Sequence, residues 1–412
     1  MRFYIRGNSM TSQSPTLFSH DQIFLPADIS YQQVLKNKKD PHKKNIMLTG
    51  VLGYVGIHLL VELLTIDGAV IYCPIRNKDG KNYNERFVET LNKFSINISS
   101  TELSRVHLFQ SDLSHALLGL SSDSYDLIAE RIDVIYHAAS SVNFIHPYNL
   151  ISNDNIQGLL EVLRFASHKQ TKTLILLSSI SVYSWGKIFT HREYAKEDDD
   201  INDNIHAITS DIGYVQSKWV MEKLTEQAAQ RGLPLIVLRL GYAMYHSKTG
   251  ACSDTQAWGS IVTTCLSTRS VPLLEDFRAG LTSVDFIAKA IVKISINGDA
   301  MGKKYNIVPA SSNKITLTYF FKQLEYLFGY KFNYVPYKNW VNLWCKDLTS
   351  PLYPLHDLFT SNVCGGRSLI ELYQHAYLLD NTNFILHFPD NEKIAPTLSK
   401  DELSNYLNFL NR

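Results

Sequence analysis

The chain has 412 residues, enough for about two or three structural units with buried cores. Hydrophobic residues make up 45% of the sequence and charged residues 19%, a balance that is typical of a folded globular protein and excludes a disordered or fibrous chain. Forty basic and 39 acidic side chains give a formal net charge of +1, so the total charge does not favour a nucleic-acid or anionic-membrane partner.

The five cysteines are widely spaced and contain no C-x-x-C motif. This pattern argues against a disulfide framework and against a zinc site, and it suits a reducing cytoplasm. No apolar run reaches the ~18 residues that a membrane-spanning helix needs, and the N-terminus lacks the apolar block of a signal peptide. We therefore expect a cytoplasmic protein with no metal site and no membrane span.

From residue 45 onward, short apolar runs alternate with longer helical patterns. The predicted buried strands are Ile46–Leu48, Val70–Ile75, Val106–Phe109, Val134–His137, Thr173–Leu177 and Pro234–Leu238. The predicted helices are Val55–Thr65, Asn84–Phe94, Ser124–Glu130, Ile156–Ser167 and Tyr214–Gln230. This alternation predicts an α/β fold of the Rossmann type, a doubly wound parallel sheet whose ligand lies at the carboxyl ends of the strands.

Two stretches depart from this alternation. His191–Asp211 contains an acidic run at 197–200 and little apolar periodicity, so we expect a solvated loop or, alternatively, a lid over the active site. After about residue 310 the pattern changes to helices and irregular segments rich in aromatic residues, which predicts a smaller, mostly helical C-terminal domain.

A glycine-rich segment joins the first predicted strand to the first predicted helix. It reads Thr49-Gly50-Val51-Leu52-Gly53-Tyr54-Val55-Gly56. Glycines in this context allow a tight turn, close approach of a pyrophosphate and close packing of the helix on the sheet, while the helix N-terminus attracts phosphate. The segment therefore predicts a dinucleotide site, against the alternative of an ordinary glycine-rich turn.

The end of the second predicted strand indicates which dinucleotide binds. NAD-dependent proteins place a carboxylate there, whereas a 2′-phosphate needs a cation. Here the strand ends at Arg76, with Lys78, Lys81 and Arg86 following and no carboxylate. A guanidinium can bind a phosphate through two hydrogen bonds, so NADPH fits better; the alternative is a solvated basic surface.

The third and fourth predicted strands end at the same edge of the sheet. Asp112 and Leu113 follow the third strand, and the Asp112 carboxylate is placed to accept a hydrogen bond from the adenine amino group. Ala138 and Ala139 follow the fourth strand, where small side chains leave room for a cofactor. We expect all four residues in the cofactor site, although simple strand-end turns would also explain them.

A catalytic pair is predicted by the Tyr-x-x-x-Lys spacing. Reduction of a carbonyl leaves an alkoxide that needs a proton, and a nearby ammonium lowers the phenol pKa and also reaches the nicotinamide ribose. Tyr214 and Lys218 begin a clean helical pattern and would share one helix face. Tyr183 and Lys187 are separated by Gly186, and the Tyr334 pair spans a proline, so neither is expected to be helical.

A hydroxyl donor for the substrate carbonyl is expected at the end of the fifth strand. Ser179 is the best candidate and Ser178 the second choice. Asn155 would hold a water that passes protons to Lys218, although a helix cap explains this residue equally well.

These residues together resemble an extended short-chain dehydrogenase/reductase. Further segments resemble the thioester reductase domains that terminate non-ribosomal peptide and polyketide synthetases, and the reductase domain of carboxylic acid reductases. These segments are Ala139–Tyr148, Gly213–Trp219, Arg239-Leu240-Gly241 to Gly250, and Ser283–Phe286. The similarity runs from about residue 21 to the C-terminal region. Leu240, Tyr245 and Pro74 depart from the usual family residues, and the first two are expected to reshape the acyl pocket.

The resemblance implies an oxidoreductase that uses NADPH to reduce an acyl or peptidyl thioester, held on the phosphopantetheine arm of a carrier protein, to an aldehyde; some members continue to the alcohol. Ser179 would stand where the family usually has Thr. Tyr214 would donate the proton, Lys218 would orient Tyr and ribose, Arg76 and Arg86 would hold the 2′-phosphate, and Gly241 would line the cofactor site. The expected division is an extension over 1–44, the NADPH domain over 45–310, some segments of which contribute to the substrate site, and the substrate and carrier domain over 311–412.

Three alternatives share parts of this pattern: a fatty acyl-CoA reductase, a nucleotide-sugar epimerase or dehydratase, and a non-catalytic dinucleotide sensor.

The aromatic residues between Tyr326 and Trp344 would pack a domain's own core or form an apolar acyl channel. Four lysines near that region would steer an acidic carrier toward the protein, namely Lys303, Lys304, Lys314 and Lys331.

Overall fold

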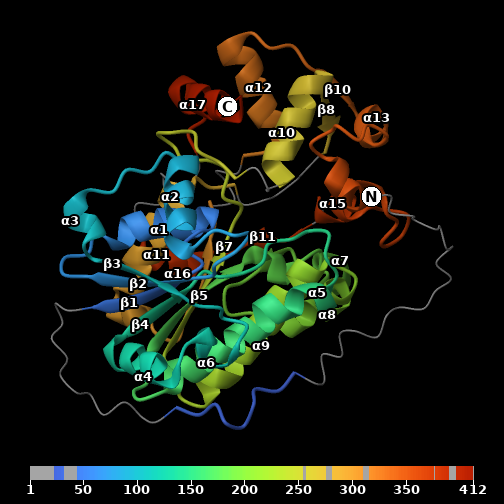
Figure 1. Ribbon diagram of the computed structural model, residues 1–412. Coiled ribbons are helices and arrows are strands. Elements are labelled where there is room, and N and C mark those ends of the chain that lie inside the picture. The colour runs from blue at the N-terminus through green and yellow to red at the C-terminus, as the bar shows by residue number, and fades with distance from the viewer. Residues whose placement is uncertain are drawn as a thin grey trace.

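A single parallel sheet organises the larger part of the protein (Figure 1). The computed structural model describes residues 23–31, 44–253, 257–274, 281–309, 315–374, 376–388 and 396–411. The sheet has the strand order β3-β2-β1-β4-β5-β7-β9. Its strands are β1 (Asn45–Thr49), β2 (Val70–Ile75), β3 (Val106–Gln110), β4 (Val134–His137), β5 (Thr173–Ser179), β7 (Leu235–Leu240) and β9 (Lys304–Ile307). The order reverses between β1 and β4, which places a ligand crevice at the carboxyl ends of these strands.

Helices cover both faces of the sheet, which is why its strands are nearly continuous apolar runs. One face is packed by α1 (Tyr54–Leu63), α2 (Tyr83–Lys93), α11 (Val284–Ser295) and α16 (Thr382–His387). The other is packed by α4 (Ser122–Arg131), α6 (Gly158–Ser167) and α9 (Gly213–Gln230). The predicted α/β class and all six predicted strands are confirmed. The seventh strand, β9, and helix α11 were not predicted.

A second hydrophobic core lies above the carboxyl ends of the strands in Figure 1. It is built from α10 (Ala257–Thr268), β8 (Ser270–Leu273), α12 (Leu317–Phe328), β10 (Asn333–Pro336), α13 (Tyr337–Trp344) and α17 (Lys400–Leu410). β8 pairs in parallel with β10. The packing therefore divides the chain differently from a boundary at residue 311: α10 and β8 belong to the second core, whereas α11 and β9 return to the first.

The aromatic residues of the C-terminal region serve mainly this second core. Tyr337, Trp340 and Trp344 are buried in it, and the two tryptophan rings meet with centroids 5.6 Å apart. Tyr326 is 83% exposed. Tyr245, expected to reshape the acyl pocket, is instead buried in the second core and stacks on Tyr406 with centroids 4.8 Å apart.

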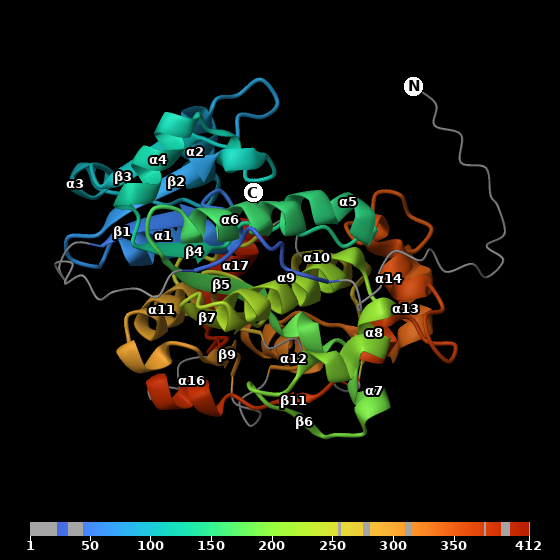
Figure 2. The ribbon, with the colours of Figure 1, turned by 90° about the horizontal axis from the view of Figure 1, so that it is seen from below.

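The segment His191–Asp211 is not a solvated loop, so that prediction is wrong. It contains β6 (Tyr194–Ala195), paired with β11 (Leu378–Leu379), the turn Ile201–Asn204 and helix α8 (Ile205–Thr209); β6 and β11 lie side by side in Figure 2. Glu197 is buried and accepts hydrogen bonds from the backbone amides of Asn306, Asn383 and Phe384. Burial raises the pKa of Glu197 to about 7, and these three bonds oppose that shift. Of the four acids at 197–200 only Glu197 is buried, and its amide partners are more than 100 residues away in the sequence.

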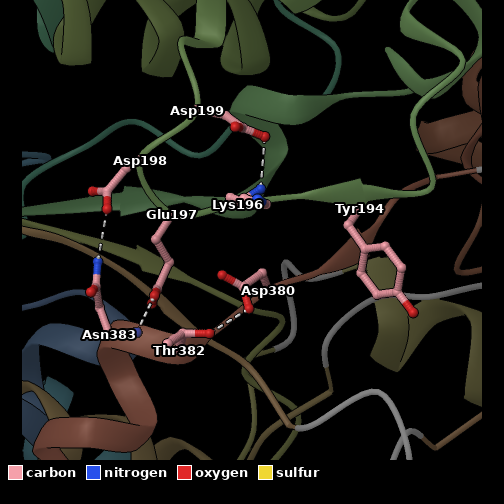
Figure 3. Close-up of a pocket in the computed structure, with 8 residues that line it drawn as sticks. All are labelled: Tyr194, Lys196, Glu197, Asp198, Asp199, Asp380, Thr382 and Asn383. Atoms are coloured by element: carbon pink, nitrogen blue, oxygen red, sulfur yellow. Dashed lines mark hydrogen bonds between the residues drawn. The ribbon is translucent and has the colours of Figure 1, made fainter.

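A surface pocket of about 450 Å³ lies beside these acids (Figure 3). Its lining comes from the β6 strand and the turn after it, and from the segment after β11. Figure 3 shows Asp198 and Glu197 directed toward Asn383, and Thr382 directed toward Asp380. None of the predicted catalytic or cofactor residues lines this pocket.

The described part of the N-terminal extension, residues 23–31, packs against the outer surface of α6 and α9. Leu25 and Ile29 are buried in the core on that side of the sheet. The Arg231 guanidinium donates hydrogen bonds to the carbonyl groups of Leu25, Pro26 and Ile29. Residues 1–22 and 32–43 of the predicted extension lie outside the described residues.

Within the part of the chain that the structure describes, no helix is both long enough and apolar enough to cross a bilayer.

Candidate active site

The turn between β1 and α1 is a cradle made of bare backbone. Gly50 has a φ of +74°, and a Cβ atom there would lie 2.5 Å from the amide nitrogen of Ala139. A Cβ atom on Gly56 would lie 2.1 Å from the carbonyl oxygen of Gly50. Gly53 precedes α1, and no side chain caps the helix N-terminus. Glycine at 50 and 56 thus lets the turn pack against the segment after β4 and lets α1 pack against the turn. The uncapped amides at the start of α1 then face outward from a turn without bulky side chains, an arrangement that fits the pyrophosphate of a dinucleotide.

Other residues of the same motif support the cradle. The Thr49 Oγ1 atom lies 2.9 Å from Nδ1 of His137 and accepts a hydrogen bond from the Ala139 amide, so it ties β1 to the segment after β4. Tyr54 is buried, and its hydroxyl donates to the carbonyl of Ala251 at 2.8 Å. Val55 packs partly against the core. The side chains of Thr49 and Tyr54 thus have protein partners.

Two arginines meet at the end of β2. Arg76 is about half exposed, with Nη1 lying 3.1 Å from Oδ1 of Asp154 and 4.0 Å from Oδ1 of Asp112. The Arg86 guanidinium donates a hydrogen bond to the Arg76 carbonyl oxygen. Arg76 is therefore an exposed cation directly at the strand end, and Arg86 fixes the backbone from which it projects.

Pro74 fits the middle of β2 because of the strand register. The amide of Val70 points to the β1 side, and alternate residues repeat that direction, so the missing N–H of Pro74 would face β1. Pairing with β1 accordingly ends at Tyr72, whereas pairing with β3 on the other side continues through Pro74 to Ile75.

The next strand ends supply the rest of the crevice. Oδ1 of Asp112 accepts hydrogen bonds from the amide and hydroxyl of Ser114. Burial opposes ionisation of Asp112, but these bonds and the Arg76 charge lower its pKa overall. Leu113 packs near Gly158, and the Gly241 amide donates to the carbonyl of Ile307, joining the end of β7 to β9.

The predicted catalytic residues come together at the carboxyl edge of the sheet. Tyr214 lies in the first turn of α9, and Ser179 ends β5. The Ser179 hydroxyl lies near enough to the Tyr214 hydroxyl to favour its ionised form. Lys218 lies one turn further along α9, with Nζ 5.8 Å from the centre of the Tyr214 ring and 3.0 Å from the carbonyl of Leu177.

The expected lowering of the phenol pKa is not found. Burial raises the pKa of Tyr214 to about 12, and the hydrogen bond from Ser179 opposes this only in part. Burial also lowers the pKa of Lys218 to about 8, against the opposing effect of the Glu222 carboxylate. Tyr214 is thus protonated near neutral pH, and Lys218 is mostly charged.

Asn155 does not cap a helix, and both polar atoms of its side-chain amide are hydrogen-bonded within the protein. It lies in the π-helical segment Asn153–Gln157 and is buried. Its side-chain oxygen accepts from the Ser141 amide at 2.6 Å, while its nitrogen donates to the Ser141 carbonyl and to the Ser217 hydroxyl. Asn155 therefore fixes the segment after β4 to α9, directly beside Lys218.

Ser178, the second choice for the hydroxyl donor, points away from the site. Its hydroxyl donates to Glu222 at 2.5 Å, and Glu222 forms a fully buried ion pair with Arg239, whose Nη2 lies 2.8 Å from Oε2. Arg239 also donates to the Tyr183 hydroxyl. Tyr183 is thus part of this network, while Lys187 pairs with a surface glutamate, so the two do not form a catalytic pair.

Several residues near the site were missed from the sequence. Phe144 lies edge-on to Tyr214 with ring centroids 5.8 Å apart, and Asp211 is buried two residues before α9 begins. Glu222 follows Lys218 by four residues, so both side chains lie on one face of α9. This spacing could have predicted that Glu222 lies near Lys218.

Comparison with known proteins agrees with this geometry. Residues 48–291 match the male sterility protein family. The chain belongs to this family. It is 30% identical to the nonribosomal peptide synthetase asaC of Aspergillus flavus, over 90% of this chain and 36% of the synthetase. It is 29% identical to the aldehyde reductase lnaA of Aspergillus flavus, over 89% of this chain and 36% of that protein. The chain thus spans about a third of the length of these relatives.

The terminal R domain from the myxalamid PKS-NRPS biosynthetic pathway has a similar structure, with a TM-score of 0.79 and 27% identity over 95% of this chain and 96% of that domain. Membership of the male sterility protein family, together with this likeness, confirms the resemblance to terminal reductase domains of the extended short-chain dehydrogenase/reductase superfamily. The matched region, residues 48–291, is thus an NAD(P)-binding domain of this family.

Proposed function

We propose that the protein reduces an acyl or peptidyl thioester to an aldehyde with NADPH. The observation that carries the proposal is the position of Ser179, Tyr214 and Lys218 together at the carboxyl edge of the sheet, next to the glycine cradle. The likeness to a nonribosomal peptide synthetase and to a terminal R domain supports a thioester as substrate. The likeness to an aldehyde reductase supports a carbonyl as the reacting group.

NADPH would be held by the backbone of Gly50, Gly53 and Gly56 and by Arg76, and it supplies a hydride for the carbonyl carbon. Ser179 would orient the carbonyl oxygen, and the Tyr214 hydroxyl would protonate it as its negative charge develops. The resulting hemithioacetal then breaks its C–S bond to give an aldehyde and a free thiol. Lys218 would hold the nicotinamide ribose and provide the positive charge beside Tyr214.

The test is incubation with NADPH and a panel of acyl thioesters, followed by identification of the products. Tyr214→Phe is expected to bind NADPH normally and to lose roughly 100-fold or more in turnover, the usual scale for a general acid. Tyr337→Phe is a matched control, because its buried hydroxyl bonds to Phe359 and Ser368 in the second core. Full activity of Tyr214→Phe would refute the assignment of the proton donor.

The preference for NADPH over NADH depends on Arg76. Arg76→Ala should weaken NADPH binding by roughly 10- to 100-fold, the loss of a charge-assisted bidentate contact, and should change NADH binding little. Lys81→Ala is the control, since Lys81 lies in the same basic stretch but pairs with Glu89 at 2.6 Å. Equal losses for both cofactors would show that Arg76 serves the fold instead.

A carrier protein is the proposed partner, supported by the synthetase relatives. The three predicted lysines that the structure describes, Lys303, Lys304 and Lys331, do not lie in one patch. Lys304 opens β9 at the amino ends of the strands, away from the site, and its Nζ atom lies 2.5 Å from Glu226. Lys303 precedes β9, Lys331 follows α12, and Lys314 lies outside the described residues.

The partner is tested by comparing one acyl group on a carrier protein, on pantetheine and on CoA. We expect the carrier-bound thioester to be reduced most efficiently, and added salt to narrow its advantage over pantetheine if surface charges assist docking. Preference for the CoA ester would favour a fatty acyl-CoA reductase.

A further inference from the structure

The start of the catalytic helix α9 is attached to a buried carboxylate that the proposed chemistry does not use. Asp211 is buried and accepts three hydrogen bonds. One comes from the Ser184 hydroxyl, one from the Ile212 amide at 2.7 Å, and one from the Tyr373 hydroxyl at 2.6 Å. A buried carboxylate with this many donors holds its neighbours firmly, because each donor would lose a charge-assisted bond by moving.

The three donors come from three separate elements that meet at the active site. Ser184 lies five residues after Ser179, in the segment that leaves β5. Ile212 immediately precedes α9, two residues before Tyr214. Tyr373 ends helix α15 (Leu369–Tyr373) in the C-terminal region.

The surrounding structure keeps these donors in place. Leu369 and Leu372 of α15 pack with Trp185, the residue after Ser184, and with Ala207 of α8 in a small buried cluster. Ser184 itself has a φ of +46°, a conformation that is unfavourable for a residue with a side chain. Its bond to Asp211 is a contact that maintains this conformation.

The Tyr373 hydroxyl is the donor to Asp211 that comes from the C-terminal region. Burial, and next the charge of Asp211, raise the pKa of Tyr373 well above its usual value. Tyr373 therefore stays protonated and acts as a hydrogen-bond donor. It links the C-terminal region to the two elements that carry Ser179 and Tyr214.

We propose that Asp211 and Tyr373 are positioning residues that fix the Tyr214 hydroxyl relative to Ser179 through the three bonds at the Asp211 carboxylate. The inference rests on the proposed reductase function and adds a role for the C-terminal region in the geometry of the proton donor. If the contact between Tyr373 and Asp211 is lost, the start of α9 and the segment after β5 are free to shift apart. Displacements of about 1 Å at a reacting group can reduce turnover by about 100-fold.

The test measures NADPH-dependent reduction of an acyl-pantetheine thioester by the full chain. Tyr373→Phe is expected to lower kcat by about 10- to 100-fold, with the KM for NADPH and the dissociation constant of NADPH unchanged. Tyr377→Phe is the matched control. Its hydroxyl also bonds internally, to Thr190 at 2.6 Å and Asn204 at 2.7 Å, but it does not contact Asp211. A purely structural role would give both variants similar melting temperatures and similar kcat values.

A double-mutant cycle provides a second readout. Asp211→Ala should lower kcat, and adding Tyr373→Phe should reduce it little further, because both changes remove the same bond. Ser184→Ala removes another donor to the same carboxylate and replaces Tyr373→Phe if that variant does not fold. Normal kcat in Tyr373→Phe or Ser184→Ala, or additive losses in the cycle, would overturn the inference. If these variants are normal while Tyr214→Phe is inactive, only the positioning role fails; if the unsubstituted protein reduces no thioester, the proposed function fails.

Discussion

Replacing Glu222 with glutamine should destabilise the fold, because the substitution breaks a fully buried ion pair. Nε of Arg239 lies 3.0 Å from Oε1 of Glu222, and Nη2 lies 2.8 Å from Oε2. Neither side chain has meaningful exposure to water. Removing one partner of a buried pair costs about 3–5 kcal/mol, since the remaining charge stays buried without compensation. Glutamine keeps one acceptor oxygen, so we expect a loss of about 3 kcal/mol, at the lower end of that range.

The same substitution should change the pH dependence of turnover. Burial lowers the pKa of Lys218 to about 8, and the Glu222 carboxylate one turn away opposes this shift. Without that carboxylate the pKa of Lys218 falls further. If turnover needs a charged Lys218, its loss at alkaline pH should begin at a lower pH in Glu222→Gln than in the unsubstituted protein.

Urea unfolding followed by circular dichroism gives the free energy of unfolding, and kcat measured from pH 6 to about 9 gives the pH profile across the Lys218 range. Glu226→Gln is the control on the same helix. Its partly exposed carboxylate pairs with Lys223 and Lys304, and such pairs are worth about 0–1 kcal/mol. Equal destabilisation by the two substitutions, together with an unshifted pH profile for Glu222→Gln, would refute this reasoning.

Three further predictions concern the cradle, acid stability and the N-terminal segment. Gly56→Ala should abolish NADPH binding measured by fluorescence, because its Cβ would lie 2.1 Å from the Gly50 carbonyl oxygen; retained affinity would contradict the cradle. Burial lowers the pKa of His58 to about 4, below its unfolded value of about 6.5. Between pH 4 and 6.5 the unfolded chain therefore binds more protons than the folded protein. The free energy of unfolding should consequently fall as the pH drops from 6.5 to 4. His58→Phe should flatten that dependence in urea unfolding, and an unchanged slope would exclude this histidine as the cause. Arg231→Ala should cost about 2 kcal/mol and speed proteolysis within residues 23–31, whereas unchanged protease resistance would show that the apolar contacts of that segment suffice.

Features that depend on nearby residues were predictable from the sequence. The glycine cradle, the buried strands and the Tyr214–Lys218 helix follow from short spacings whose chemistry is local. Ser179 was predicted because it ends β5 at the carboxyl edge of the sheet, and its neighbour Ser178 faces the other way, toward Glu222. The charge run at 197–200 was misinterpreted because sequence polarity does not reveal whether distant amides surround a carboxylate.

The sequence by itself determined the parallel sheet, the dinucleotide turn and the placement of Tyr214 and Lys218 on one helix, because helix and strand periodicity and the geometry of a tight turn are set within a few neighbouring residues. Only the tertiary structure decided the partners of the buried charges. Arg239 meets Glu222 because β7 lies beneath α9, and Tyr373 reaches Asp211, 162 positions earlier in the chain, because α15 packs against the segment after β5. Such pairings depend on how distant elements share a common core, and no local pattern in the sequence contains that information.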